Sequence, residues 1–218
     1  MRSTRRSEFG VLPATGLQER LRILKSKASN LIWKPTRDQI LAAEGKTVRD
    51  VIGPNLKVLF CGINPGLYTA AVGHHFARPG NRFWKALRDA GFTEQLMSPF
   101  DERELLALGY GVTNVVTRAT ATADALTREE IVQGGHRLTR KVLRYRPGIL
   151  AVLGVGAYRA GFNQPKAVVG RQELTIGETV VWVLPNPSGL NANYQQQDLA
   201  RLFRELNEAA STMTALRS

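Results

Sequence analysis

Short apolar runs and segments with helical periodicity alternate along most of the chain. Three short runs are apolar and rich in residues that favour strands, at 57–61, 110–116 and 148–154. Runs of this length are typical of strands buried on both faces of a sheet. A further segment, 172–185, predicts a hairpin that turns at Gly177-Glu178.

Helix signals lie between these runs. Asn81 can cap a helix that continues through 82–90 and that Gly91 ends. Thr127 and Glu130 have the spacing of a capping box, which predicts a long helix up to about residue 145. Each strand therefore leads into a helix.

The end of the chain follows the same pattern. A short helix is predicted up to Gly161, and a C-terminal helix from about Tyr194 carries on one face Leu199, Leu202, Phe203 and Leu206. Strands that alternate with helices predict an α/β fold, a three-layer α/β/α sandwich with a mainly parallel central sheet. We assign residues 51–218 to a single domain of this kind.

Residues 1–50 are predicted to be a basic extension with short helices. The segment 17–27 spaces its leucines at helical intervals among basic residues. Thr36 can act as an N-cap, with Gln39 completing a capping box and Gly45 ending the helix. These helices are expected to lie against a body and not to form a second domain.

The net charge of the chain indicates what kind of partner it binds. The 218 residues include 30 Lys and Arg against 18 Asp and Glu, a net charge of +12, and half of the excess falls within residues 1–50. Such a charge favours polyanionic partners, nucleic acid above all. An apolar content of 43% is ordinary for a globular protein and too high for a disordered one.

Several classes of protein are disfavoured by the composition. No apolar run approaches the length of a membrane span, and the N-terminus lacks a signal-peptide core, so we expect a cytoplasmic protein, nucleoid-associated in a bacterium. Cys61 is the single cysteine, which excludes an internal disulfide, a four-thiolate cluster and a cysteine zinc site. We therefore expect no metal.

Two unusual loops follow predicted strands, at 62–66 and 185–193. Ligands of open α/β sheets bind beyond the carboxyl ends of the strands, so both loops are candidates for a site. No complete G-x-x-x-x-G-K-S/T motif is present, because Ile40 stands where the first glycine before Gly45-Lys46-Thr47 would be. No G-x-S-x-G motif is present either, and Arg159 replaces the third glycine of a dinucleotide fingerprint. His74 and His75 have no evident partner for a metal site.

The remaining constellation consists of Asn64 on a Gly/Pro turn, Phe76 twelve residues later, and Leu190 on the second loop. An Asn side chain is not a base near neutral pH, but it can hold a water or a carbonyl by hydrogen bonds. An aromatic ring that stacks on a planar base and a leucine that inserts into a duplex are typical features of base-flipping enzymes.

Three motifs together, GINPG at 62–66, GHHFARPGNRFW at 73–84 and NPSGL at 186–190, closely resemble the mismatch-specific uracil/thymine-DNA glycosylases of the uracil-DNA glycosylase superfamily. The resemblance extends over about 58–206. It implies a monomeric enzyme that cuts the N-glycosidic bond of a flipped uracil, or of a related lesion opposite guanine, in double-stranded DNA. It also implies no metal and no diffusible cofactor.

The resemblance assigns roles residue by residue. Asn64 matches the asparagine that positions the attacking water. The residues matched to the base pocket are Gly62, Ile63, Pro65, Gly66, Thr69, Phe76 and Asn186, and those matched to the DNA-contacting segment are Ser188, Gly189, Leu190, Asn191 and Ala192. Some relatives carry an arginine where this chain has Ala192, so the preference for the opposite base stays open, and single-stranded DNA could be cut more readily.

Several side chains allow two interpretations. Asp89 is the first carboxylate after the first motif, and it either forms an i,i+4 surface pair with Lys85 or assists the water in place of a motif aspartate. Arg82 and Lys85 are interpreted as solvated side chains or phosphate contacts. His74 and His75 are interpreted as polar loop residues more readily than as catalysts.

Two rival functions remain at this point. A nucleic-acid-binding module of the same fold would bind DNA without cutting it. A nucleotide hydrolase would need metal-binding carboxylates near the first loop, and the absence of Asp and Glu from 51–88 speaks against it.

Overall fold

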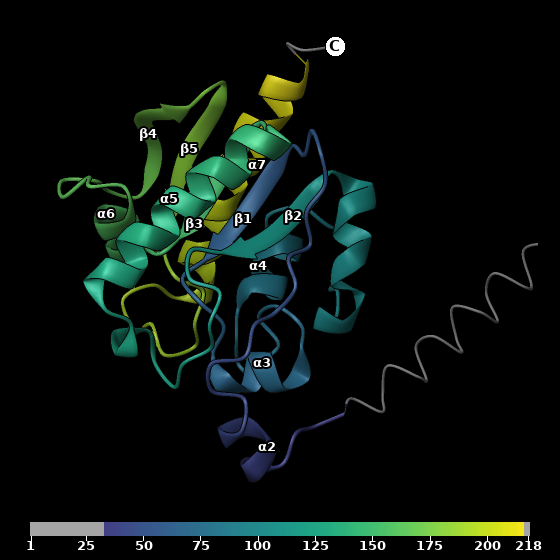
Figure 1. Ribbon diagram of the computed structural model, residues 1–218. Helices are drawn as coiled ribbons and strands as arrows, with labels where there is room; N and C mark the ends of the chain where they lie inside the picture. Colours follow the sequence, from purple (N-terminus) through teal and green to yellow (C-terminus); the bar gives the residue numbers. More distant parts are fainter. Residues whose placement is uncertain (1–32, 216–218) are drawn as a thin grey trace, which may run out of the picture. The chain divides into compact units, whose positions relative to one another are not determined.

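The computed structural model describes residues 33–215 and has a five-stranded sheet at its centre (Figure 1). The strands are β1 (Val58–Gly62), β2 (Tyr110–Asn114), β3 (Ile149–Leu153), β4 (Gly170–Ile176) and β5 (Thr179–Leu184). Their order is β2-β1-β3-β5-β4; the first four in this order are parallel, and β4 pairs antiparallel with β5. The predicted mainly parallel sheet and its terminal hairpin are confirmed.

Helices cover the sheet on both faces (Figure 1). They are α2 (Arg37–Leu41), α3 (Leu67–Val72), α4 (Phe83–Asp89), α5 (Arg128–Tyr145), α6 (Val155–Gly161) and α7 (Gln196–Ala215), with 3-10 turns η1 (Pro99–Leu108) and η2 (Ala123–Ala125). One core cluster joins the sheet to α4 and α7, and the other joins it to α5 and α6. This is the predicted three-layer α/β/α arrangement.

The pleat of β1 explains how one strand serves both cores. Phe60 belongs to the cluster under α4 and α7, whereas its neighbours Leu59 and Cys61 belong to the cluster under α5 and α6. The Phe60 ring lies edge-on to Phe83 at 5.4 Å and stacks on Phe203 at 6.1 Å. Full burial of each such side chain contributes roughly 1.5–3 kcal/mol, so these contacts fix α4 and α7 on the sheet.

The local signals for two of the helices are also confirmed. Both capping boxes are present: the Thr36 hydroxyl accepts from the Gln39 amide at 3.3 Å, and the Thr127 hydroxyl accepts from the Glu130 amide at 3.1 Å. At α4 the N-cap position falls to Arg82 and not to Asn81 as predicted, although the Asn81 side chain accepts from the backbone amide of Phe83, the first helical residue, at 3.0 Å.

Residues 35–50, which fall in the predicted extension, pack with the α/β unit. The compact unit begins at Pro35, and Ala43 and Val48 are buried in one cluster with Ala70 and Ala119. The helix predicted at 17–27 lies outside the described residues. Within residues 33–215, no helix is both long enough and apolar enough to cross a membrane.

Candidate active site

A cavity of about 290 Å³ lies at the carboxyl ends of the parallel strands. Four segments line it: the 62–66 loop after β1, the segment from Asn114 to Asp124 after β2, the segment from Thr69 to Asn81, and the loop after β5. This is where an open α/β sheet places its ligands. The described side chains around it include no group of three or more His, Cys, Asp or Glu that could hold a metal ion.

Backbone hydrogen bonds hold the first two of these segments side by side. The amide of Val115 donates to the carbonyl of Gly62 at 2.9 Å, and that of Val116 donates to Ile63 at 2.9 Å. Farther along, the Thr120 amide donates to the Pro65 carbonyl at 3.2 Å. The GINPG turn therefore has a fixed neighbour along its whole length.

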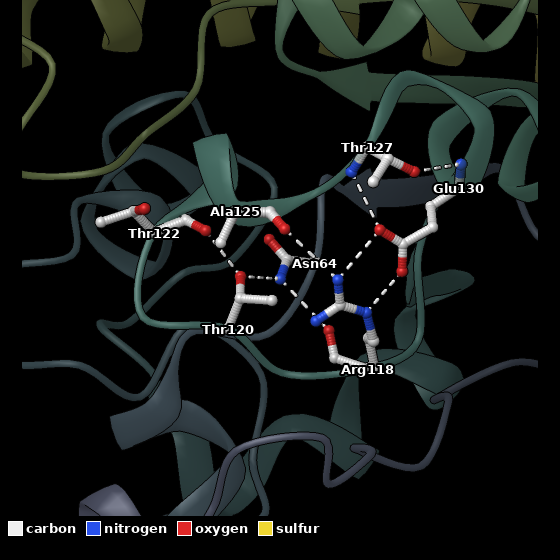
Figure 2. A network of polar contacts seen from close by, with 7 residues as sticks. All are labelled: Asn64, Arg118, Thr120, Thr122, Ala125, Thr127 and Glu130. Carbon is white, nitrogen blue, oxygen red and sulfur yellow. Dashed lines mark hydrogen bonds and ion pairs between the residues drawn. The ribbon is translucent and has the colours of Figure 1, made fainter.

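Asn64 projects from this turn with its amide in a defined orientation (Figure 2). Its Nδ2 lies 3.2 Å from the Arg118 carbonyl and 2.7 Å from the Thr120 hydroxyl oxygen. The Thr120 hydroxyl donates its own proton to the Thr122 carbonyl at 2.6 Å, so towards Asn64 it can only accept. The NH₂ group must therefore face Thr120. Asn64 lines the cavity, and its Oδ1 has no hydrogen-bond partner within residues 33–215, so this oxygen is free to accept a hydrogen bond there.

The Arg118 loop, residues 117–126, carries Thr120 and is tied to the start of α5 (Figure 2). The guanidinium of Arg118 donates to Glu130 through two bonds of 2.5 and 2.9 Å, and to the Ala125 carbonyl at 3.3 Å. The hydrogen bond from Arg118, aided by the Thr127 backbone amide, lowers the pKa of Glu130 to about 2. A bidentate pair of this kind fixes direction as well as distance.

Phe76 forms one wall of the cavity in a strained conformation. Its φ is +53°, in the left-handed region, and its ring stacks on Phe83 with centroids 4.1 Å apart. Gly62 permits this approach, because a Cβ there would lie 3.3 Å from the Phe76 ring and 2.5 Å from Oδ1 of Asn114. Backbone strain held by surrounding packing is common in ligand sites.

His75 is buried, and its bonds define a second amide in the cavity. Its Nε2 lies 3.2 Å from the Arg49 carbonyl, which can only accept, so Nε2 carries the proton. Nδ1 then accepts from Nδ2 of Asn114 at 3.4 Å, which turns Oδ1 of Asn114 towards Gly62. Burial lowers the pKa of His75, which favours this neutral form.

The predicted site residues are distributed as follows. Ten of the fourteen line the cavity: Gly62, Ile63, Asn64, Pro65, Gly66, Thr69, Phe76, Asn186, Ser188 and Leu190. Gly189, Asn191 and Ala192 lie on the same loop but outside this cavity. Leu190 is 72% exposed, as a residue that enters a duplex would be.

Asp89 lies outside the cavity, at the last residue of α4. Its carboxylate contacts Lys85 at 2.5 Å, Arg88 at 2.6 Å and Gln196 at 2.9 Å. Desolvation is the largest single influence and raises the pKa of Asp89, but the three hydrogen bonds together outweigh it and lower the pKa to about 2. The i,i+4 pair with Lys85 is therefore present, and the carboxylate is occupied by it.

Sequence reasoning missed the carboxylate that does line the cavity. Among the described lining residues the acidic one is Asp124, on η2 within the Arg118 loop. The network that orients Asn64 also fixes this loop on both sides of Asp124, at Thr122 and Ala125. The available signal was its position after the second strand, at the edge of the sheet where sites form.

Residues 49–210 match the model of the uracil DNA glycosylase superfamily. The chain belongs to the uracil DNA glycosylase superfamily. Members of this superfamily are typically glycosylases that act on N-glycosyl bonds, so DNA is the implied substrate. The match includes all four segments that line the cavity.

Proposed function

We propose that this chain is a monofunctional glycosylase of the mismatch-specific uracil/thymine type. It flips uracil, and related damaged pyrimidines, out of G·U-type mispairs in double-stranded DNA and leaves an abasic site for base-excision repair. The observation that carries the proposal is the orientation of Asn64. An amide whose NH₂ group is tied to Arg118 and Thr120 offers its oxygen to a water in the cavity.

The chemistry follows from the charges that develop. The bond between C1′ and N1 breaks with its electron pair going to N1, so the base leaves as an anion and the sugar becomes an oxocarbenium-like cation. Backbone N–H groups of the 62–66 turn are suited to stabilise the anion, since they need no reorganisation. The oxygen of a water held by Asn64 bonds to C1′, and the carboxylate of Asp124 accepts the proton that this water loses.

The cavity walls suit a flipped pyrimidine. Phe76 offers an aromatic ring for stacking, and Oδ1 of Asn114 offers an acceptor for an N–H of the base. Leu190 fills the gap in the duplex, and the charge of +12 favours contacts with the phosphates. Because Ala192 has no long side chain for the orphaned guanine, we expect weak selection of the opposite base and some cleavage of single strands.

The test is cleavage of a labelled duplex with one G·U pair, in EDTA, followed by alkali to break abasic sites. Wild type should give strand breaks, and Asn64→Ala should abolish them while keeping its affinity for the duplex. Asn207→Ala is the matched control, because that asparagine lies on α7 and bonds the Ala90 carbonyl. If the wild type binds DNA in a salt-sensitive manner but cuts no uracil substrate, the proposed enzyme activity is refuted and a non-catalytic DNA-binding module of the same fold is favoured.

A further inference from the structure

Arg82 holds the backbone of the wedge loop, residues 185–193. Its Nη1 donates to the Tyr194 carbonyl at 2.5 Å, and its Nη2 donates to the carbonyls of Ser188 and Asn191 at 2.6 and 2.9 Å. Its own amide donates to the Pro187 carbonyl at 3.0 Å. One residue therefore binds the loop at three points and binds Tyr194, directly after the loop, at a fourth. Its guanidinium is held by backbone carbonyls, so it is not a freely solvated side chain, which was one of the two interpretations that the sequence left open.

The bonded carbonyls lie on both sides of the exposed leucine. Ser188 precedes Gly189-Leu190 and Asn191 follows it, so the guanidinium closes the base of the turn that presents Leu190. Close packing adds to this, because a Cβ on Gly189 would lie 2.6 Å from the Gly80 carbonyl oxygen. The shape of the turn is thus set by the segment that precedes α4.

The same segment forms the wall of the base cavity. Asn81, directly before Arg82, lines the cavity, and Phe83, directly after it, stacks on Phe76. Arg82 thereby joins the wedge loop to the wall that would receive the flipped base. No carboxylate within residues 33–215 forms an ion pair with Arg82, and its guanidinium donates to three backbone carbonyls instead.

Arg82 also sets the direction of two peptide groups. In a trans peptide the C=O and N–H point in opposite directions, and the described chain has no cis peptide bond. Carbonyls of Ser188 and Asn191 that face Arg82 therefore turn the N–H groups of Gly189 and Ala192 away from it. Both residues are exposed, and neither N–H donates to another residue within 33–215, so both are available to an anionic backbone.

We propose that Arg82 is a positioning residue for base flipping. It keeps the wedge loop in the shape that inserts Leu190 into a duplex, and it takes no part in breaking the glycosidic bond. The proposal rests on the proposed function and adds a specific consequence. Loss of Arg82 impairs excision where a base must be extruded from a duplex, and spares excision where no duplex has to be opened.

The experiment compares single-turnover excision of uracil from a G·U duplex and from the same strand alone. Arg82→Met should lower the duplex rate roughly tenfold or more and leave the single-strand rate within about twofold. Arg82→Lys, which can still reach part of the carbonyl cluster, should recover part of the loss. Arg88→Met removes the same charge from α4, the helix that begins directly after Arg82, without touching the wedge loop, and it should match wild type on both substrates.

A second readout separates flipping from chemistry. In an Asn64→Ala background, the fluorescence of 2-aminopurine placed beside the target uracil should increase on binding. Adding Arg82→Met should reduce that increase. The thermal midpoint of each variant is measured to show that it is folded. Equal losses on both substrates, or a duplex rate unchanged in a folded Arg82→Met, would overturn the proposal. Absence of cleavage by wild type on either substrate would instead refute the proposed function.

Discussion

The hydroxyl of Thr120 accepts a hydrogen bond from the side chain of Asn64 at 2.7 Å and donates to the Thr122 carbonyl at 2.6 Å. A residue 56 positions away thereby decides which end of the Asn64 amide faces the cavity. Since only the oxygen of an amide accepts a hydrogen bond from water, this contact connects the Arg118 loop to the proposed chemistry.

Thr120→Val should test this connection, because it keeps the shape of the side chain and removes the hydroxyl. Asn64 would then have only the Arg118 carbonyl to hold it, and the amide could rotate. We expect a single-turnover rate lower by on the order of tenfold to a hundredfold, with duplex affinity retained. The unpaired buried groups should also cost about 1–2 kcal/mol of unfolding free energy. Thr120→Ser restores the hydroxyl and should recover most of the rate.

Asp124→Asn should show whether Asp124 or Asp89 is the carboxylate that assists the attacking water. The substitution removes the group proposed to accept the proton from water, and it should lower the maximal rate on the order of 10²-fold while leaving duplex affinity nearly unchanged. Asp89→Asn is the matched comparison, because that side chain lies outside the cavity among Lys85, Arg88 and Gln196. A larger loss in Asp89→Asn than in Asp124→Asn would reverse the assignment.

The elements that sequence predicts well here are those with local causes. Both capping boxes form as expected, since their partners lie three residues apart, and β1 is buried on both faces as its composition indicates. The Asn64 turn could be singled out for the same reason. It combines Gly and Pro residues directly after an apolar strand, at the edge where ligands bind.

The residues that sequence reasoning missed depend on register and on distant contacts. Asn114 enters the site because it is the register partner of Gly62 across two parallel strands, and no local pattern specifies that register. Asp124 lines the cavity from a loop that Arg118 ties to Glu130 on α5, a contact that no local pattern specifies. The sequence around Arg82 is typical of a surface residue, because the wedge loop that it contacts lies more than a hundred positions later in the chain.

Glu130→Gln should loosen the Arg118 loop and remove an acid-dependent part of the stability. The folded-state pKa of Glu130 is lowered to about 2 from an ordinary value of 4.5, so the unfolded state binds the proton first as the pH falls. The stabilisation is therefore complete above about pH 5 and lost as the pH falls from there to about 2.

Urea unfolding of wild type and Glu130→Gln across that range checks this expectation. The two proteins should differ at pH 6 and converge towards pH 2, and the variant should also cleave more slowly at neutral pH. Glu205→Gln breaks the exposed i,i+4 pair with Arg201 on α7 and should leave the cleavage rate unchanged. A Glu130→Gln variant with the wild-type rate would show that Asn64 and Asp124 do not need this ion pair.

His75 should give the protein a separate pH dependence at higher pH. Burial lowers the pKa of His75 below its ordinary 6.5, so just below that pH the unfolded state binds more protons than the folded state. The free energy of unfolding should consequently fall as the pH drops from about 6.5 to the folded-state pKa. A charged ring could no longer accept from Asn114, and excision should weaken over the same interval.

His75→Gln keeps an N–H donor for the Arg49 carbonyl and cannot titrate, so this part of the pH slope should disappear. The matched control is His136→Gln, since His136 is exposed on α5. Unfolding curves measured between pH 7.5 and pH 5 should show a reduced slope for His75→Gln alone. Equal slopes in all three proteins would mean that the neutral, buried His75 is not what makes the fold sensitive to acid in this range.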